Sequence, residues 1–209
     1  MNMRMRLLGS LFGLALAGAC AQALAADDSA PIPSKWKPQE INYSYVGFTT
    51  AYDCDAAADR VKTILTTLGA HPDTKVRASG CPASRPSRTF FLKITTATPV
   101  PVADFKETSA DKSRRELLDR LGAKKDISTE EFPATWKSVE LSKERRLNIR
   151  PGDCELIEGL RDKVLPKLGI KIEEERITCT PNQLDLQPPQ LRVSALVPVK
   201  SADKPETKS

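Results

Sequence analysis

Histidine is almost missing from this chain, because His71 is the only imidazole among its 209 residues. Hydrolases of the Ser-His-Asp or Cys-His type need a base beside the nucleophile. His71 would have to serve alone, and its place next to Pro72 is typical of an exposed turn. The chain also has no Cys-x-x-Cys pair and no glycine-rich phosphate loop, so we expect no metal and no cofactor. These absences favour a protein without a catalytic site.

Long apolar runs are missing after the N-terminus, so no later segment is expected to span a membrane. Residues 1–25 begin with a basic stretch and end at Ala23-Leu24-Ala25, a small-x-small cleavage site. The apolar stretch between them, 7–19, is shorter than the ~20 residues of a transmembrane helix. This pattern predicts a signal peptide and export to the periplasm or the medium. The residues before Cys20 also fit a lipoprotein box, so acylation of Cys20, with membrane anchoring, stays open.

Neither sign of charge dominates the chain. The formal net charge is +5, removal of Arg4 and Arg6 with the signal peptide lowers it by two, and acids and bases are interspersed. Such a surface is solvated and does not favour a nucleic-acid partner. Aromatic residues make up only 5% of the chain, so the core is expected to be small and largely aliphatic.

The two halves of the chain repeat each other at a spacing of 100 residues. The shared positions are Pro33, Trp36, Lys37, Asp53, Cys54, Leu65, Leu68 and Gly69, which recur as Pro133, Trp136, Lys137, Asp153, Cys154, Leu165, Leu168 and Gly169. A long period of this kind is typical of a tandem duplication in which each copy is one structural unit. The sequence therefore predicts two similar modules.

Four cysteines remain besides Cys20, and an even number predicts disulfides in an exported protein. Three pairings of four cysteines are possible. The repeat chooses among them, because each copy holds one cysteine before its expected helix and one after it. We therefore predict that Cys54 pairs with Cys81 and that Cys154 pairs with Cys179.

Each copy is predicted to form a strand, a helix and two further strands. The expected strands alternate apolar and polar residues, or precede the second cysteine. They cover 41–45, 74–81 and 90–95 in the first copy and 139–141, 171–179 and 191–197 in the second.

The helix of each copy is indicated by an apolar stripe at helical spacing. The stripes are Ala57, Val61, Ile64, Leu65 and Leu68 in the first copy, and Ile157, Leu160, Val164, Leu165 and Leu168 in the second. Asp53 and Asp153 are expected to cap the helix starts, and Gly69 and Gly169 to end the helices. Pro166 should distort the last turn of the second helix.

The predicted fold class is α+β, with two tandem β-α-β-β modules, each a two-layer α/β sandwich that holds one disulfide. The expected organisation is a signal peptide (1–25), a flexible lead-in (26–35), module 1 (36–105), a connector (106–131), module 2 (132–200) and a disordered tail (201–209). The connector contains a short amphipathic helix over 109–121, expected to pack on one module or to bridge them. Edge-to-edge joining of the sheets of the two modules stays open.

This module resembles uncharacterised exported proteins of Gram-negative bacteria that carry a Trp-Lys, Asp-Cys, Leu-Gly, Cys pattern. The resemblance is carried by Trp36-Lys37, Gly47-Phe48-Thr49-Thr50, Cys54, Leu68-Gly69 and Cys81. It spans most of the chain after the signal peptide, and it implies no known activity.

The copies differ most in the stretch before the helix. The first copy holds every tyrosine of the chain, Tyr43, Tyr45 and Tyr52, with Phe48 among them, whereas the second has Lys143, Arg145, Arg146 and Arg150. Because aromatic rings are favoured contact residues, we predict a partner-binding site at these four aromatic residues, with Trp36 and Lys37 beside it. The alternative is that the strand tyrosines fill a face of the sheet and that Trp36 covers the end of the core.

The predicted function is that of an exported, non-catalytic binding or envelope-accessory protein whose partner is a protein or another envelope component. The alternative is a hydrolase that acts through carboxylates on cell-wall or glycan material. Its candidate residues are the acids that flank Cys54 and Cys154, for which helix capping is the simpler explanation.

Overall fold

The computed structural model of the protein describes residues 30–82, 85–122, 128 and 130–199. Several parts of the predicted organisation lie outside the described residues. They are the signal peptide with Cys20, the start of the lead-in (26–29) and the tail (201–209).

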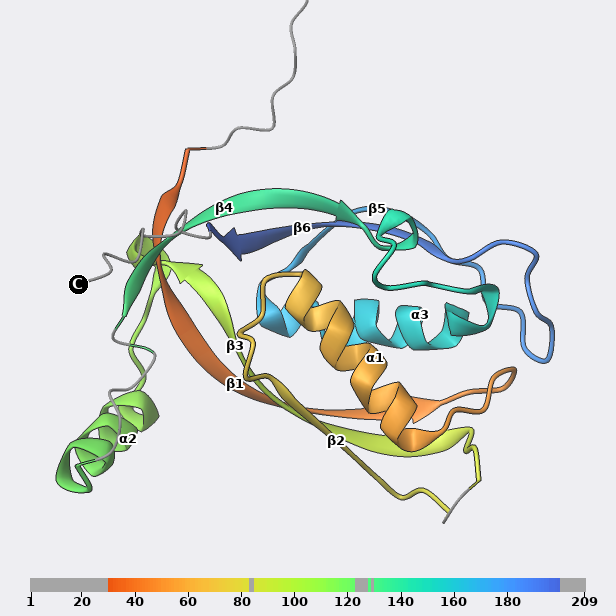
Figure 1. Ribbon diagram of the computed structural model, residues 1–209, viewed down its shortest axis with the longest axis horizontal. Coiled ribbons are helices and arrows are strands. Elements are labelled where there is room, and N and C mark those ends of the chain that lie inside the picture. Colours follow the sequence, from red (N-terminus) through yellow and green to blue (C-terminus); the bar gives the residue numbers. More distant parts are fainter. Residues whose placement is uncertain (1–29, 83–84, 123–127, 129, 200–209) are drawn as a thin grey trace, which may run out of the picture.

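Six strands form one antiparallel sheet in the order β2-β3-β1-β4-β6-β5 (Figure 1). The strands are β1 (Ile32–Val46), β2 (Lys75–Ser79), β3 (Thr89–Pro101), β4 (Glu131–Glu140), β5 (Lys171–Arg176) and β6 (Gln190–Pro198). Three of them, β1 to β3, come from the first half of the chain, and β4 to β6 come from the second half. The α+β class is confirmed, with one continuous sheet that spans both halves.

The two halves join edge to edge through β1 and β4. Residues 32–35 of β1 pair with residues 131–134 of β4, and Pro33 lies directly opposite Pro133. The expectation of a flexible lead-in is therefore wrong over residues 32–35. Proline cannot donate a hydrogen bond to the ladder and is rare inside sheets, so the local sequence did not indicate a strand here. Pairing with β4 and β3 stabilises this part of β1.

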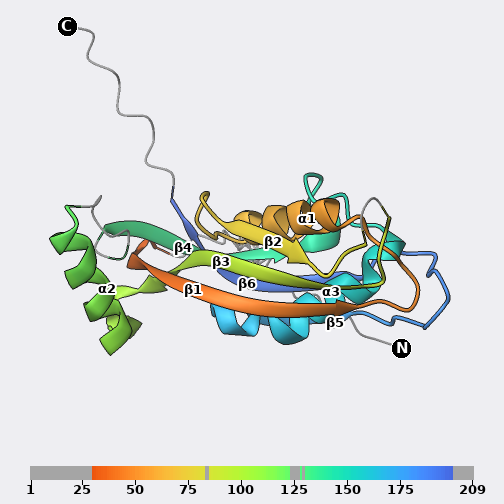
Figure 2. The same cartoon turned by 90° about the horizontal axis from the view of Figure 1, so that it is seen from below.

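Two helices, α1 (Cys54–Thr67) and α3 (Cys154–Lys163), lie between the two halves of the sheet (Figure 1). Figure 2 separates them, with α1 at the upper edge and α3 at the lower edge of the strands. Short 3-10 segments lie beside the main elements, at η1 (Val102–Asp104), η3 (Leu141–Lys143), η4 (Pro151–Asp153) and η5 (Pro166–Leu168). Buried apolar residues from both halves belong to one core cluster, so each half covers part of the other.

The predicted patterns of three strands and of both helices are confirmed by burial. The strand expected at 139–141 is instead the end of β4, and Leu141 begins η3. Inward-facing residues are buried in β1 (Ile41, Tyr43, Tyr45), in β3 (Phe90, Leu92, Ile94) and in β6 (Leu191, Val193, Ala195). All ten residues of the two expected helical stripes are buried as well. The alternation therefore identified the faces that pack on the core.

The ends of the helices follow the sequence signals in three of four cases. Asp53 caps α1, because its carboxylate accepts two backbone N–H groups of the first turn, each at 3.1 Å. Gly69 and Gly169 have positive φ angles of 87° and 74°, the left-handed conformation in which glycine ends helices. The last turn after Lys163 is a 3-10 segment that begins at Pro166, as the proline predicts. The fourth signal, Asp153, acts differently and is described below.

The connector contains the expected helix, α2 (Ser109–Arg120), which Thr108 caps. It does not pack on the sheet or bridge the halves as expected, because Leu117 and Leu121 are exposed and Figure 1 shows α2 standing away from the end of the sheet. A few leucines among charged residues offer too little apolar area to hold the helix against the core.

Both predicted disulfides are confirmed, Cys54 with Cys81 and Cys154 with Cys179. Each joins the first residue of a helix to the segment after the following strand. The sequence separations are 27 and 25 residues. Each cross-link therefore stays within one half and restricts the unfolded chain of that half alone.

A single cut between the halves tests this architecture. We expect protein with a specific protease site inserted after Gly122 to remain one particle on a native sizing column after cleavage, because the halves share a sheet and a core. In a denaturing gel without reductant the fragments should separate, since both described disulfides lie within a half. Fragments that stay linked until reductant is added would contradict the pairing, and fragments that part on the column would contradict the shared core.

Candidate binding site beside Phe48

The predicted aromatic cluster does not form a surface. Tyr43 and Tyr45 are only 3% and 1% exposed, so the alternative, that they fill a face of the sheet, is correct. They point inward together because alternate residues of a strand share a face. Tyr52 is half-buried against the same core, and Phe48 alone is well exposed, at 55%.

Trp36 and Lys37 lie toward the opposite end of β1 from Phe48, and about 30 Å of strand separates them from Val46, where β1 ends. Trp36 is buried, and its ring packs against Phe132 and His71 with centroids 4.6 Å and 4.8 Å away. Trp36 therefore covers one end of the core, as the alternative expected. The prediction that His71 is an exposed turn residue is wrong, because this ring contact half-buries it.

Asp153 joins the two halves and does not cap α3 as predicted. Its buried carboxylate accepts hydrogen bonds from the Tyr52 hydroxyl at 2.7 Å, from Arg60 Nη1 at 2.9 Å and from the backbone N–H of Arg150 at 2.7 Å. Tyr52 and Arg60 belong to the first half. The turn η4 ends at Asp153 and gives it φ and ψ of −84° and 2°, whereas an N-cap residue is extended.

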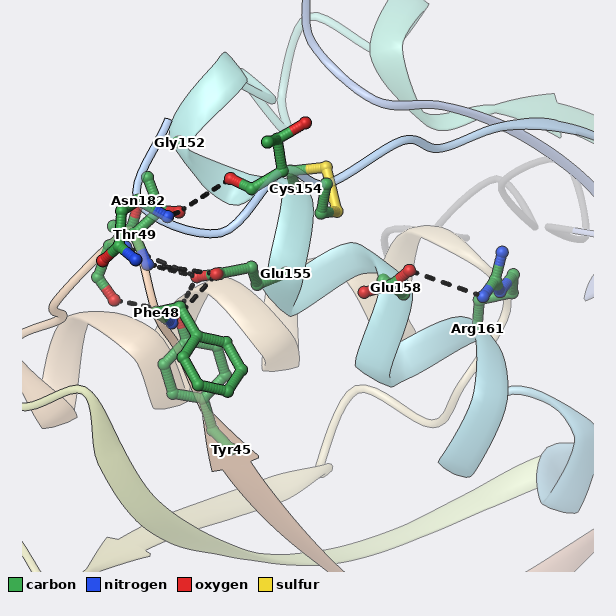
Figure 3. Close-up of a disulfide and its surroundings, with 12 residues drawn as sticks. Tyr45, Phe48, Thr49, Gly152, Cys154, Glu155, Glu158, Arg161 and Asn182 are labelled. Atoms are coloured by element: carbon green, nitrogen blue, oxygen red, sulfur yellow. Dashed lines mark hydrogen bonds and ion pairs between the residues drawn. A yellow bond between two sulfur atoms is a disulfide. The ribbon is translucent and has the colours of Figure 1, made fainter. Parts of the chain in front are cut away.

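Glu155 holds the loop of residues 47–52, which follows β1 (Figure 3). Its carboxylate accepts the backbone N–H groups of Phe48 at 2.9 Å, Thr49 at 3.0 Å and Thr50 at 3.4 Å. The Tyr45 hydroxyl lies 3.4 Å from the same carboxylate. Burial raises the pKa of Glu155, but the three backbone N–H groups outweigh burial, so the pKa lies below its ordinary value. Glu155, in the first turn of α3, thus binds the 47–52 loop, which lies about a hundred residues earlier in the chain.

A hollow of about 230 Å³ opens beside this loop, between Phe48 and α3. Its lining includes Val46 at the end of β1 and Phe48 in the loop that follows. On α3 it includes Glu155, Glu158, Asp162 and Lys163. Glu155 fixes the loop on one side of the hollow, and the Cys154–Cys179 disulfide fixes the segment that carries Pro181 on another. The hollow is therefore built from both halves. The Glu155 hydrogen bonds join the halves beside it, and the disulfide holds the wall that the second half supplies.

The floor of the hollow carries the Tyr43 hydroxyl. Gly159 makes room for it, because a Cβ at position 159 would collide with the hydroxyl oxygen. No hydrogen bond from this hydroxyl is present within the described part of the chain, and every fully buried side-chain oxygen or nitrogen there has a partner. The hydroxyl is therefore reached from the hollow. Burial, then Asp162 and Glu158, raise the pKa of Tyr43 above its ordinary value.

Sequence reasoning missed the residues that α3 adds to this hollow. Glu158 and Asp162 lie four residues apart on one side of the helix and were not distinguished from an ordinary solvated face. Gly159 offered a signal, because glycine inside a helix destabilises it and usually has a packing reason. The corresponding position of the first half is Asp59, so the hollow has no equivalent residue there.

A larger hollow, of about 490 Å³, lies beside residues 185–190. Leu186 in this segment is almost fully exposed, whereas Pro189 is buried. Its lining includes Cys154, which is bound in a disulfide, and Arg176, which pairs with Glu174. The hollow beside Phe48 is the better candidate site, because both halves line it and the buried Tyr43 is part of its lining, whereas the second half alone lines the larger hollow.

Acidification tests the role of Glu155. Its pKa is lower in the folded protein than its ordinary value of 4.5, so the ionised carboxylate stabilises the fold above that pH, and the contribution is lost as the pH falls through the folded pKa. We expect Glu155→Gln to lower Tm at pH 7. The difference in Tm between the wild type and the variant should become smaller as the pH falls from about 5 to about 3. Asp55→Asn, the equivalent change in the first half, is the control, because Asp55 is exposed. A Tm difference that stays constant over this range would contradict the role of the charge.

Within the described ranges, no group of three or more His, Cys, Asp and Glu side chains is placed to hold a metal ion. No helix in this part of the chain is both long and apolar enough to cross a membrane. No protein-family model, curated protein or solved structure matches the chain, so its function has to be inferred from the geometry of the site.

Proposed function

We propose that this is an exported, non-catalytic binding or envelope-accessory protein that holds a protein or another envelope component at the hollow beside Phe48. The observation that carries the proposal is the use of the two acids that flank Cys154. Asp153 and Glu155 are occupied by hydrogen bonds from Tyr52, Arg60 and the 47–52 loop. Carboxylates bound in this way join the two halves and are not free to react with a substrate, and Glu155 also lines the hollow.

The alternative function, a carboxylate-dependent hydrolase of cell-wall or glycan material, has less support. Glycoside hydrolysis by two carboxyl groups needs one with a raised pKa that stays protonated as the general acid. The pKa of Glu155 is shifted in the opposite direction. Asp153 is buried and accepts hydrogen bonds from Arg60 and Tyr52, so its carboxylate is not accessible to a glycan.

Export is supported by the two disulfides, because such bonds persist in oxidising compartments. The predicted signal peptide (1–25) supplies the route. Two mature forms are possible, a soluble chain that starts at Ala26 and a chain acylated at Cys20, and we favour the first. Mass spectrometry of the N-terminal peptide from the native cell envelope distinguishes them.

We also propose that the two halves are copies of one ancestral module. Each half has the order strand, helix, strand, strand and a disulfide at the same place in that order. In the β1–β4 pair, Pro33 faces Pro133, its equivalent in the repeat. An antiparallel pair centred on equivalent residues is the arrangement that a two-fold relation between copies produces. On this proposal, module 1, predicted as 36–105, begins at Ile32 with β1. Module 2, predicted as 132–200, begins at Glu131 with β4.

Photo-cross-linking tests the binding function. p-Benzoylphenylalanine is placed at position 48 or at position 91 in protein made in its own host. Phe91 is a matched control, because both phenylalanines are 55% exposed and Phe91 does not line the hollow. We expect an adduct of defined mass from position 48 and none from position 91.

Two results would contradict the proposal. Adducts from neither position, or equally from both, would speak against binding at the hollow. Hydrolysis of peptidoglycan or glycan substrates that Glu158→Gln abolishes, with an unchanged Tm, would favour the hydrolase.

A further inference from the structure

We propose that the hollow beside Phe48 receives a basic side chain, arginine or lysine, from a peptide segment of the partner. This inference rests on the proposed binding function and names the chemistry that the site recognises. It is carried by three features of the hollow: its charge, its apolar rim and the free hydroxyl on its floor.

Acids outnumber bases around the hollow. Glu155, Glu158 and Asp162 line it, with Lys163 as the single base among the lining residues. Arg161 on the same helix bonds to Asp162 at 2.7 Å and lies 3.9 Å from Glu158. It is also drawn to Glu175 on β5, at 3.2 Å. One guanidinium is thus shared among three carboxylates, and the field in the hollow favours a cation over an anion.

The rim of the hollow suits the stem of a long basic side chain. Phe48 and Val46 are both more than half exposed and both line it. Arginine and lysine cover apolar surface with their stems while the charged head reaches polar groups. A guanidinium or ammonium within about 6 Å of a ring face is further attracted by the aromatic electrons. Phe48 can therefore contact the apolar stem of such a side chain and also attract its charged head.

The free hydroxyl of Tyr43 supplies a polar contact at the floor. Tyr43 is only 3% exposed and its oxygen opens to the hollow without a hydrogen-bond partner. This oxygen can accept an N–H from a guanidinium or an ammonium group. Glu158 and Asp162 act on it as negative charges, which a bound cation would neutralise.

The size of the hollow favours one side chain over a whole small molecule. Its volume of about 230 Å³ is below the roughly 300–1,000 Å³ of typical small-molecule pockets. Phe48 and Val46 extend the apolar surface beyond the hollow, where the flanking residues of a peptide would lie. We therefore commit to a peptide as the source of the cation.

Titration followed by NMR of the ¹⁵N-labelled protein tests the inference. The probes are the capped peptides Ac-Leu-Arg-Leu-NH2 and Ac-Leu-Cit-Leu-NH2, where Cit is citrulline, and free arginine. Citrulline keeps the shape of arginine but has no charge. We expect saturable shifts of the Phe48, Gly159 and Lys163 amides with the arginine peptide. Binding of the citrulline peptide and of free arginine should be about ten-fold weaker or more.

Three variants locate the contacts. Phe48→Ala and Glu158→Gln should each weaken the arginine peptide about five-fold. Phe91→Ala should leave it unchanged, because Phe91 is as exposed as Phe48 but lies outside the hollow. An equal loss in the Phe91→Ala variant would overturn the assignment to this hollow.

The remaining outcomes separate the ligand class from the binding function. Equal affinity for the citrulline peptide would overturn the cation and leave the hollow as a binding site. Free arginine as tight as the peptide would overturn the peptide as source. No shifts with any probe would refute the basic ligand if position 48 still cross-links to a partner, and would count against the binding function as well if it does not.

Discussion

Replacing Asp153 with alanine is expected to lower the free energy of unfolding by about 3 kcal/mol. The buried carboxylate accepts hydrogen bonds from Tyr52 and Arg60 of the other half. Without it, the Arg60 guanidinium, whose side chain is only 23% exposed, loses its counter-ion. For a chain of this size the loss corresponds to a fall in Tm of roughly 6–12 °C, measured by thermal unfolding.

The equivalent change in the first half, Asp53→Ala, is the matched control. Asp53 caps α1 at the surface, and loss of an N-cap costs about 1 kcal/mol. Equal losses in the two variants would mean that Asp153 acts only as a cap. Asp153→Asn, which keeps the shape, should show an intermediate loss, and it keeps the test readable if the alanine variant does not fold.

Replacing Gly69 with alanine is also expected to cost about 3 kcal/mol, from two sources. Its φ of 87° strains a residue with a Cβ by about 1–2 kcal/mol. In addition, the Cβ would lie 2.5 Å from the carbonyl oxygen of Leu196 and 3.1 Å from Cα of Val197. These are backbone atoms of β6, which cannot rotate away as a flexible side chain can. Urea denaturation of the purified variant measures the loss.

Gly169→Ala provides the comparison at the same position of the repeat. Gly169 has a similar φ of 74°, but no described atom lies within 4 Å of the place that a Cβ would take. Only the conformational cost of about 1 kcal/mol is expected there. Equal losses at both glycines would show that the end of α1 is not held against β6.

Local patterns were sufficient wherever the deciding interaction is local. The alternation at Ile41, Tyr43 and Tyr45 indicated a face of β1, because strand geometry depends on neighbours in sequence. The cap at Asp53 and the left-handed glycines likewise depend on one helical turn. The disulfide pairing followed from the residues that recur 100 positions apart, since the two halves place their cysteines alike.

The same patterns failed where the partner of a residue lies in the other half. Asp53 and Asp153 look alike in sequence, yet one caps a helix and the other binds Tyr52 and Arg60. The strand tyrosines were predicted to bind a partner. The alternating pattern shows that they share one face of the strand, but it does not show whether that face is covered by this chain or by another molecule. That cover is α3, whose Gly159 lies against Tyr43.

The sequence by itself determined the element order within each half and the pairing of the cysteines, because these depend on spacing and on local backbone conformation. Only the tertiary structure decided that β1 and β4 join the halves into one sheet, that Glu155 holds the 47–52 loop, and that Phe48 alone of the predicted aromatic cluster is well exposed. The physical reason is that these outcomes depend on contacts between residues about a hundred positions apart. Their free energies are set by packing and by buried hydrogen bonds that no local pattern records.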